Sequence, residues 1–295
     1  MSSKVALLYN PVAGQGRFKY KLDTVIHKLQ NRGLQLVPIR LNSNEEIPNY
    51  LSRLNAHEYH SLIAAGGDGT INGVAAAMMR CGFNVPLCIL AQGTSNDVAS
   101  YLNLPAKLEE SCRVIAEGQL TPIDLGMVNG QDYFINVASA GFITETAHDV
   151  DYRLKNALGR LAYYIKAMEK LPKIKPLQLK LEVDDEKYEE EILLFLILNG
   201  GTAGGFQGLL PSGCMSDGML DFMAIKPGLM PGLTRLLINY QRGGLLEDKN
   251  VIHRRGKVFN LSLEPQARTD LDGEKGPPLP WKVEVCPGVL NIRTM

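Results

Sequence analysis

Hydrophobic positions in the first 120 or so residues alternate between two patterns. Short continuous apolar runs, each typical of a buried strand, occur at residues 5–9, 34–39, 61–65 and 85–91. Between and after them, apolar residues recur at helical spacing at 17–32, 45–54, 71–80, 97–102 and 108–117. Strands that alternate with helices at this spacing predict a parallel sheet with helices on both faces.

The pattern changes after about residue 121. Strand-like runs then predominate, at residues 123–128, 133–137, 177–183, 188–198, 220–225, 258–263 and 283–285. Asn129-Gly130 and the charged residues 184–187 separate neighbouring runs and predict hairpin turns. One long helical pattern covers residues 151–171. This half predicts an antiparallel sandwich or barrel.

Length and composition agree with two folded domains. A chain of 295 residues with 45% hydrophobic and 21% charged residues is long enough for about two domains, at roughly 100–200 residues each. We expect an α/β domain at residues 1–125 and a β-rich domain at 126–295. A return of the final strand to the first domain remains open.

Charge, cysteine usage and apolar runs narrow the class of protein. The formal net charge is zero, which disfavours a nucleic-acid partner. Five cysteines without a C-x-x-C pair predict reduced thiols, with neither a disulfide framework nor a zinc site. The first apolar run is too short for a signal peptide, and the longest later run, 192–198, is far below the ~20 residues of a membrane span. We therefore expect a cytoplasmic protein.

Net neutrality conceals two oppositely charged segments. Residues 153–175 hold seven basic residues and one acidic residue, whereas residues 182–191 hold seven acidic residues and one basic residue. The basic segment also has apolar residues at helical spacing, so it could lie on an anionic membrane surface. A core-packed helix with a solvated basic face explains the pattern at least as well. Peripheral association with the inner face of the membrane thus stays an open alternative.

The segment Gly66-Gly67-Asp68-Gly69-Thr70 is the most informative one for chemistry. It follows a predicted strand and precedes a predicted helix. Ligands of open α/β sheets bind at this end of the strands, where glycines and a helix N-terminus suit phosphate oxygens. Asp68 could hold a metal ion there. The simpler alternative is a helix-capping turn.

Two more polar loops follow predicted strands at the same edge of the sheet. They are Asn10-Pro11-Val12-Ala13-Gly14 and Gly93-Thr94-Ser95-Asn96-Asp97. Three such loops together outline a crevice suited to a nucleoside triphosphate. The sequence lacks a Walker A motif and a complete G-x-G-x-x-G, which disfavours a P-loop ATPase and a dinucleotide dehydrogenase.

Two Asp-Gly segments in the second half could be turns or sites. Asp270-Leu271-Asp272-Gly273-Glu274 could supply a carboxylate that accepts a proton from a hydroxyl, and Asp217 of residues 216–218 could bind a hard cation together with nearby carbonyls. In isolation, an ordinary turn is the better interpretation of each.

Taken in order, these motifs resemble those of the diacylglycerol kinase catalytic family, and most closely its soluble bacterial lipid kinases. Gly-Gly-Asp-Gly-Thr is shared with NAD kinases, but the loop at 93–97 and the late Asp272-Gly273-Glu274 favour a lipid kinase. The resemblance implies an α/β N-terminal domain (NAD kinase/diacylglycerol kinase-like, with a parallel sheet) and a β-sandwich C-terminal domain. The active site would lie in the cleft between them.

The resemblance also implies roles for individual residues. The ATP-binding residues would be Asn10, Pro11, Val12, Ala13, Gly14, Gly66, Gly67, Asp68, Gly69, Thr70, Ile71, Asn72 and Thr94. Asp68, Asp97 and Asp124 would reach the catalytic Mg²⁺ partly through water. Asp272 is the first choice for the general base and Glu274 the second. A structural Mg²⁺ would be bound by the Asp217 carboxylate and the carbonyls of Cys214 and Met219.

The implied reaction is transfer of the γ-phosphoryl group of ATP to a lipid hydroxyl at the membrane surface. Diacylglycerol, giving phosphatidic acid, is the first hypothesis for the acceptor. Sphingoid bases, phosphatidylglycerol, polyprenols and NAD remain alternatives, as does a non-catalytic nucleotide- or lipid-sensing module. A homodimer is compatible with the resemblance. The glycine-rich stretch at 199–206 could line a lipid entrance or be a plain loop.

Overall fold

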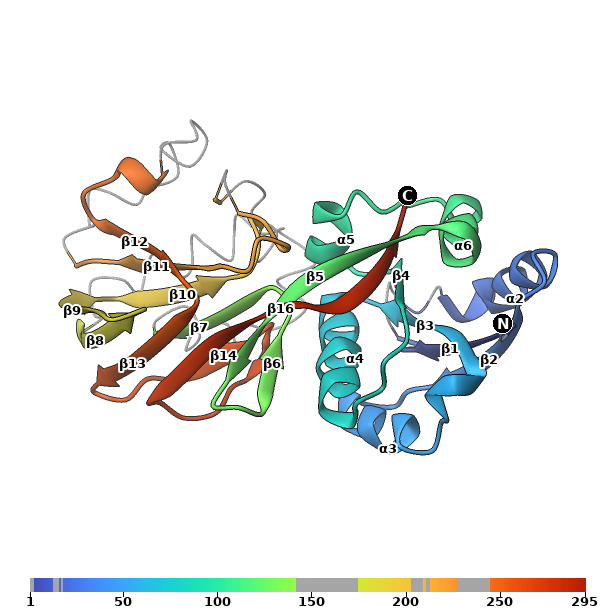
Figure 1. Ribbon diagram of the computed structural model, residues 1–295, viewed down its shortest axis with the longest axis horizontal. Coiled ribbons are helices and arrows are strands. Elements are labelled where there is room, and N and C mark those ends of the chain that lie inside the picture. Colours follow the sequence, from blue (N-terminus) through green and yellow to red (C-terminus); the bar gives the residue numbers. More distant parts are fainter. Residues whose placement is uncertain are drawn as a thin grey trace.

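The computed structural model describes residues 3–12, 16, 18–141, 175–202, 209–210, 213–227 and 245–295. The helix expected at 151–171, most of the basic segment, and Ala13 and Gly14 lie outside these residues. The molecule is elongated, with an α/β part at one end and a β-rich part at the other (Figure 1). Two long strands, β5 (Gln119–Val128) and β16 (Trp281–Thr294), run between the two parts.

The N-terminal part is the expected parallel sheet covered on both faces. Its strands are β1 (Lys4–Tyr9), β2 (Gln35–Arg40), β3 (Tyr59–Gly66) and β4 (Leu87–Ala91), in the order β2-β1-β3-β4. Its helices are η1 (Phe18–Lys21), α2 (Leu22–Gln30), η2 (Asn44–Glu46), α3 (Ile47–Leu51), η3 (Ala56–Glu58), α4 (Asp68–Cys81), α5 (Asp97–Tyr101) and α6 (Leu108–Glu117). The predicted fold class of this domain is confirmed.

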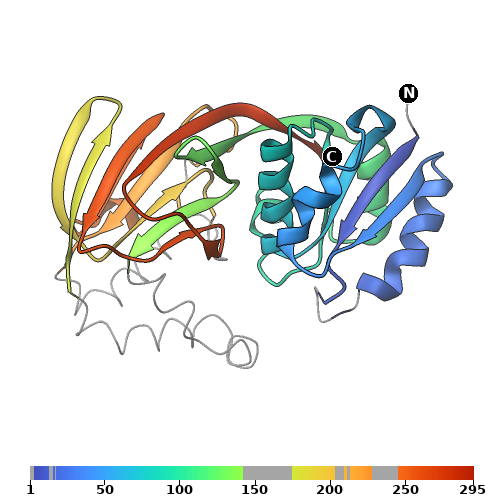
Figure 2. The ribbon, with the colours of Figure 1, turned by 90° about the horizontal axis from the view of Figure 1, so that it is seen from below.

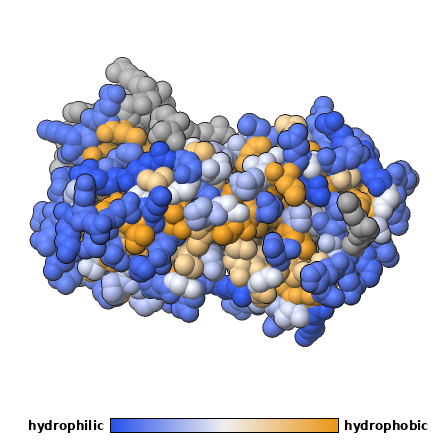
Figure 3. Space-filling view, viewed as in Figure 1, coloured by the Kyte–Doolittle hydropathy of each residue, from blue (hydrophilic) through white to orange (hydrophobic). Residues whose placement is uncertain are grey.

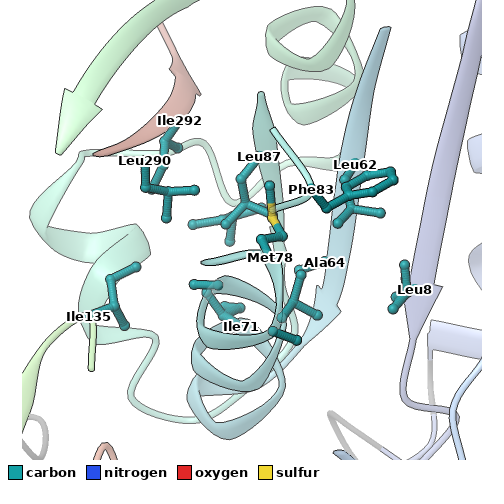
Figure 4. Packing of buried hydrophobic residues seen from close by; sticks show 14 of the residues in the cluster. Leu8, Leu62, Ala64, Ile71, Met78, Phe83, Leu87, Ile135, Leu290 and Ile292 are labelled. Atoms are coloured by element: carbon teal, nitrogen blue, oxygen red, sulfur yellow. The ribbon is translucent and has the colours of Figure 1, made fainter. Parts of the chain in front are cut away.

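Alternation along the strands explains the two covered faces. Val5 and Leu7 of β1 pack in the cluster that contains α2 and α6, whereas Ala6 and Leu8 pack in the cluster that contains α3 and α4. Successive side chains of a strand point to opposite faces, so a continuous apolar run requires helices on both sides. Ile71 and Met78 of α4 face β3 and β4 in the second cluster (Figure 4).

The C-terminal part is the expected β-sandwich. One of its sheets has the order β12-β11-β10-β7-β14-β15. The other contains β16, β13, β8 and β9 and continues through β16 into the parallel sheet. The additional bounds are β6 (Asp132–Phe134), β7 (Val137–Gly141), β8 (Leu177–Val183), β9 (Glu186–Ile192), β10 (Leu194–Leu198), β11 (Leu220–Ile225), η5 (Leu245–Glu247), β12 (Val251–Gly256), β13 (Val258–Glu264), β14 (Thr269–Leu271) and β15 (Glu274–Lys275).

The last strand connects the two domains. β16 pairs antiparallel with β5 from Val283 opposite Val128 to Thr294 opposite Gln119, and Ile292 lies opposite Leu87 of β4 in a parallel pair. The sequence predicted a strand only at 283–285. Pro287 and Gly288 interrupt the apolar pattern, and the register shifts between Cys286 and Leu290, so a bulge replaces the expected end of the strand.

Two other expected strands are each divided. The run at 133–137 becomes β6 and β7, because the intervening N–H groups donate to the Asp272 side chain instead of a neighbouring strand. The run at 188–198 becomes β9 and β10, which belong to different sheets. In both cases the apolar pattern continues across the point where the chain changes its hydrogen-bonding partner, so the pattern alone does not predict the division.

The molecule's surface follows the same division. On the face in Figure 3, hydrophilic residues cover both ends, and hydrophobic residues gather toward the middle. Among the described residues, every helix is too short or too polar to cross a membrane.

The aromatic core of the sandwich depends on Trp281. This side chain is buried, its ring lies edge-on to Phe195 at 5.8 Å, and its indole N–H donates to the Pro277 carbonyl at 2.9 Å. We expect Trp281→Ala to lower the free energy of unfolding by about 3–5 kcal/mol. Since Trp281 is the one tryptophan of the chain, urea unfolding should be followed by circular dichroism. The exposed Leu120→Ala is the control, and an equal effect of both would contradict this role.

The C-terminal end of β16 is tied to the α/β domain through His60. Arg293 Nη2 lies 2.9 Å from His60 Nε2; because a guanidinium only donates, Nε2 accepts and the ring is neutral. Burial, and then the charge of Arg293, lower the pKa of His60 below 6.5. The unfolded chain therefore binds a proton more readily, and the stability due to this contact is lost as the pH falls below about 6.5.

We expect the free energy of unfolding to fall less steeply between pH 7 and pH 5 in His60→Gln than in the unmodified protein. Equilibrium unfolding across this range measures the two slopes. His57→Gln, on the exposed η3, is the control. Identical slopes for His60→Gln and the unmodified protein would rule out this linkage.

Candidate active site

Two glycine loops meet at the carboxyl ends of β3 and β4. A Cβ atom at Gly93 would lie 2.7 Å from Gly67 Cα, and a Cβ atom at Gly66 would lie 2.5 Å from the Thr70 side chain. Glycine is therefore required at position 93 for the close approach of the two loops, and at position 66 for the tight turn into α4. The loop after β1 lies at the same edge, since Asn10 N–H donates to the Ala65 carbonyl at 3.1 Å.

Asp68 holds the second glycine loop in place. It is the first residue of α4, and its two carboxylate oxygens accept the N–H groups of Asn96 at 2.8 Å and Asp97 at 2.7 Å. Asn96 has a positive φ of 52° and closes the loop by bonding both the N–H and the carbonyl of Gly93. Asp97, at the start of α5, is buried. Two of the expected acidic residues are thus brought together by one turn.

Asp124 joins three segments where β5 crosses between the domains. Its side chain is buried, and it accepts the N–H of Gly218 at 2.7 Å and of Gly288 at 2.8 Å. Its own N–H donates to the Met215 carbonyl at 2.6 Å. The carboxylate therefore fixes both the loop around Asp217 and the bulge of β16.

Asp272 lies in the turn between β14 and β15 with a positive φ of 54°. Its carboxylate accepts the N–H groups of Ile135 at 2.7 Å, Asn136 at 3.0 Å and Val137 at 2.8 Å. The residue as a whole is partly exposed, but its carboxyl group is enclosed. Burial raises the pKa of Asp272 to about 7, although the three N–H groups act to lower it.

Glu274 brings the β-rich domain to the glycine loop. It is exposed, and Asn44 Nδ2 donates both to its Oε1 at 3.3 Å and to the Gly69 carbonyl at 3.0 Å. Asn72 Nδ2 of α4 lies 3.4 Å from the Asp272 carbonyl. The turn at 272–274 therefore lies against the N-terminus of α4. Sequence reasoning missed Asn44, which begins the short helix η2 after β2 and belongs to no motif.

The expected nucleotide-binding residues occupy different environments. Thr94 belongs to the loop beside Asp68. Ile71 belongs to α4, and its side chain is fully buried in the hydrophobic core between this helix and the sheet. The N–H groups of Thr70 and Ile71 donate to the Gly67 carbonyl at 3.0 and 3.1 Å, as the first turn of the helix. Pro11 and Val12 form a turn in which Val12 N–H bonds Asn10 Oδ1 at 3.0 Å.

The loop expected to bind a structural cation has a basic partner. Asp217 Oδ1 accepts the Met219 N–H at 3.1 Å, and Asp217 Oδ2 forms an ion pair with Arg255 of β12. Cys214 Sγ lies 3.5 Å from Ser216 Oγ. A cation bound through the carbonyls of Cys214 and Met219 would therefore share the Asp217 carboxylate with a guanidinium. Nothing in the sequence marks Arg255 as this partner.

The acidic residues suit Mg²⁺ in ligand type but do not form a protein cage. Asp68, Asp97 and Asp124 offer the oxygen ligands that Mg²⁺ prefers. Within the described part of the chain, no three His, Cys, Asp or Glu side chains cluster closely enough to ligate one ion. Mg²⁺ commonly keeps several waters and binds substrate phosphates, so such carboxylates fit an ion that is held largely through water.

Comparison with known proteins agrees with this geometry. Residues 4–128 match the family described as "Diacylglycerol kinase catalytic domain", and residues 136–294 match the "YegS C-terminal NAD kinase beta sandwich-like domain". A protein of Bacillus subtilis (strain 168) named diacylglycerol kinase is 34% identical over 94% of this chain and 91% of its own length. One of the same name from Staphylococcus carnosus (strain TM300) is 31% identical over 95% and 91%.

Solved structures show the same fold. The crystal structure of a diacylglycerol kinase from Bacillus anthracis str. Sterne has a TM-score of 0.81 at 25% identity, covering 99% of this chain and 97% of that chain. Another structure from the same strain has a TM-score of 0.85 at 26% identity, covering 99% and 95%. Because the likeness spans nearly the whole chain and both domains, the protein is an enzyme that belongs to the diacylglycerol kinase catalytic family of lipid kinases.

Proposed function

We propose that the protein transfers the γ-phosphoryl group of ATP to the hydroxyl group of diacylglycerol and so forms phosphatidic acid. The relatives named diacylglycerol kinase support this choice of acceptor. The observation that carries the proposal is the meeting of the two domains, where Asn44 contacts both Gly69 of the glycine loop and Glu274 of the β-rich domain. A phosphate donor held by the glycine loops and the carboxylates of the 272–274 turn would then lie on opposite sides of one site.

The glycine loops would hold the triphosphate. Residues 10–12, 66–72 and Thr94 lie at or near the carboxyl ends of the strands, where close backbone approach and the N-terminus of α4 favour phosphate. Ala13 and Gly14, which follow Val12 in the chain, stay part of the proposed phosphate-binding set. The N–H groups of Thr70 and Ile71 already donate to the Gly67 carbonyl. We therefore propose that these two residues shape the glycine loop and do not donate their N–H groups to phosphate. Phosphoryl transfer needs positioning and charge neutralisation more than covalent chemistry from the protein.

The acidic residues would hold the metal. Bound Mg²⁺ would neutralise charge on the phosphate oxygens, and Asp68, Asp97 and Asp124 would orient its waters. A second cation at Asp217, with the carbonyls of Cys214 and Met219, stays part of the proposal. Arg255 already supplies positive charge to that carboxylate. We therefore expect the structure of this loop to depend less on a bound metal ion than it would if the Asp217 carboxylate had no basic partner.

Asp272 is the proposed general base. The acceptor oxygen forms a bond to the γ-phosphorus as the bond from phosphorus to the bridging oxygen of ADP breaks, and the hydroxyl proton passes to the Asp272 carboxylate. A pKa of about 7 for Asp272 matches the task, because efficient bases titrate near the working pH. Glu274 is the second candidate, since it lies on the side of the glycine loop.

The acceptor and the assembly stay proposals. Sphingoid bases, phosphatidylglycerol and polyprenols are other acceptors to test. NAD also stays among the acceptors to test, since one matched family is described as "NAD kinase beta sandwich-like". We further propose that the enzyme is cytoplasmic and associates peripherally with the membrane surface, where a lipid substrate lies. A homodimer, which the family resemblance allows, is also part of the proposal. A radiolabelled-ATP assay against these acceptors, with diacylglycerol in mixed micelles, tests the assignment.

We expect Asp272→Asn to lower kcat by about 100- to 10,000-fold, the range for loss of a general base, with ATP binding retained. In the unmodified enzyme, kcat should rise with pH through about 7 and then level off, since only the ionised carboxylate accepts a proton. Single-turnover assays over pH 5.5–9 measure both effects. Asp185→Asn, in the remote β8–β9 hairpin, is the control. If Asp272→Asn kept full activity and Glu274→Gln lost it, Glu274 would be the general base instead.

Asp68→Asn should raise the Mg²⁺ concentration for half-maximal activity by about 10- to 100-fold, as for other residues that support a metal through water. It should also lower the melting temperature, because the carboxylate binds two N–H groups of the neighbouring loop. A magnesium titration and a thermal melt separate the two effects. The exposed Asp23→Asn serves for comparison. An unchanged magnesium titration would argue against the assigned role.

A further inference from the structure

Asn199 is a buried polar residue at the junction of the two domains. It follows β10, begins the glycine-rich stretch, and is 1% exposed. Its backbone N–H donates to the Asn136 carbonyl at 3.0 Å. None of the roles assigned above uses its side chain.

The side-chain amide of Asn199 bridges two segments of the site. Nδ2 donates to the Asp124 carbonyl at 2.6 Å and to the Ile135 carbonyl at 2.8 Å. Both partners can only accept, so the contacts fix which side of the amide is nitrogen. Among the described residues, Asn199 Oδ1 is buried without a hydrogen-bond partner. Burial of such an acceptor costs free energy, which the two hydrogen bonds donated by Nδ2 offset.

The two bridged segments each hold one acidic group. The backbone of Asp124 carries the carboxylate that binds Gly218 and Gly288, and residues 135–137 provide the three N–H groups that bind the Asp272 carboxylate. Asp124 belongs to β5, whereas Asp272 belongs to the turn after β14. Within the described part of the chain, the Asn199 amide is a direct side-chain connection between the two supports.

We propose that Asn199 is a positioning residue, which fixes the Asp124 strand relative to the turn that holds Asp272 and so sets the distance between the metal side and the base side of the site. The inference rests on the proposed function. Its catalytic importance follows from geometry: a misplacement of about 1 Å between reacting groups can cost about 100-fold in rate.

The test uses Asn199→Asp, which keeps the shape but loses the amide donors, and Asn199→Ser, which can bond at most one of the two carbonyls. We expect kcat to fall about 10- to 100-fold in both, with a smaller change in KM. Loosening the 135–137 turn weakens N–H groups that lower the pKa of Asp272. The acidic limb of the pH profile should therefore move to higher pH, and the half-saturating Mg²⁺ concentration should rise.

Phe259→Leu is the control for lost stability. Phe259 is fully buried in the sandwich core, so the variant should lower the melting temperature without moving the pH profile or the magnesium titration. If the Asn199 variants match this control, with a lower melting temperature and an unshifted profile, the positioning role is overturned.

Hydrogen exchange separates this inference from the proposed function. Each variant is measured at the same number of degrees below its own melting temperature. Under that condition, the amide hydrogens of residues 135–137 should exchange faster in Asn199→Ser than in Phe259→Leu. If the unmodified protein transfers phosphate to no acceptor, the proposed function fails. Faster exchange would then still support the bridge, and unchanged exchange would overturn it.

Discussion

Pairing between β5 and β16 is the constraint on which the rest of the structure depends. The two strands remain paired from the sandwich core to the edge of the parallel sheet, with one interruption at the bulge around Gly288. The same strands thus carry residues of one hydrophobic cluster in each domain: Val128 and Val283 in the sandwich, and Ile123 and Ile292 in the α/β domain. Figure 2 shows both strands arching from one part to the other. A shared ladder of this length places the 272–274 turn against α4 more firmly than a flexible linker would.

The carboxylates of the site accept hydrogen bonds from backbone N–H groups. Asp68 and Asp124 each accept two, and Asp272 accepts three. Hydrogen bonds to ionised acceptors are stronger than neutral ones, so each carboxylate stabilises a loop that would otherwise leave N–H groups unpaired. Structure and chemistry are therefore coupled at these positions. Removal of one acid alters both the local charge and the shape of the loop that binds it.

Sequence reasoning succeeded where a pattern is local. The bounds of α6, β8 and β11 agree with the expected runs, because each element presents one apolar pattern over its whole length. It failed where a partner is distant. The length of β16 depends on Asp124, which stabilises the bulge from 164 positions away in the chain, and β12 has too many charged residues to show an apolar run.

The same distinction applies to the candidate site. Asp68 and Asp272 stand in glycine-containing motifs, which can be recognised in the sequence because glycine marks a tight turn of the chain. Asn44 and Arg255 stand in no such motif, and Asn199 precedes a glycine-rich stretch that does not indicate what its side chain binds; the contacts of all three cross 25 or more positions in the chain. Asparagine in particular has no preferred pattern, since one amide can cap a turn or bridge two strands. Residues that hold catalytic groups in register are thus the least visible in a sequence, because their role is defined by partners that only the folded chain brings together.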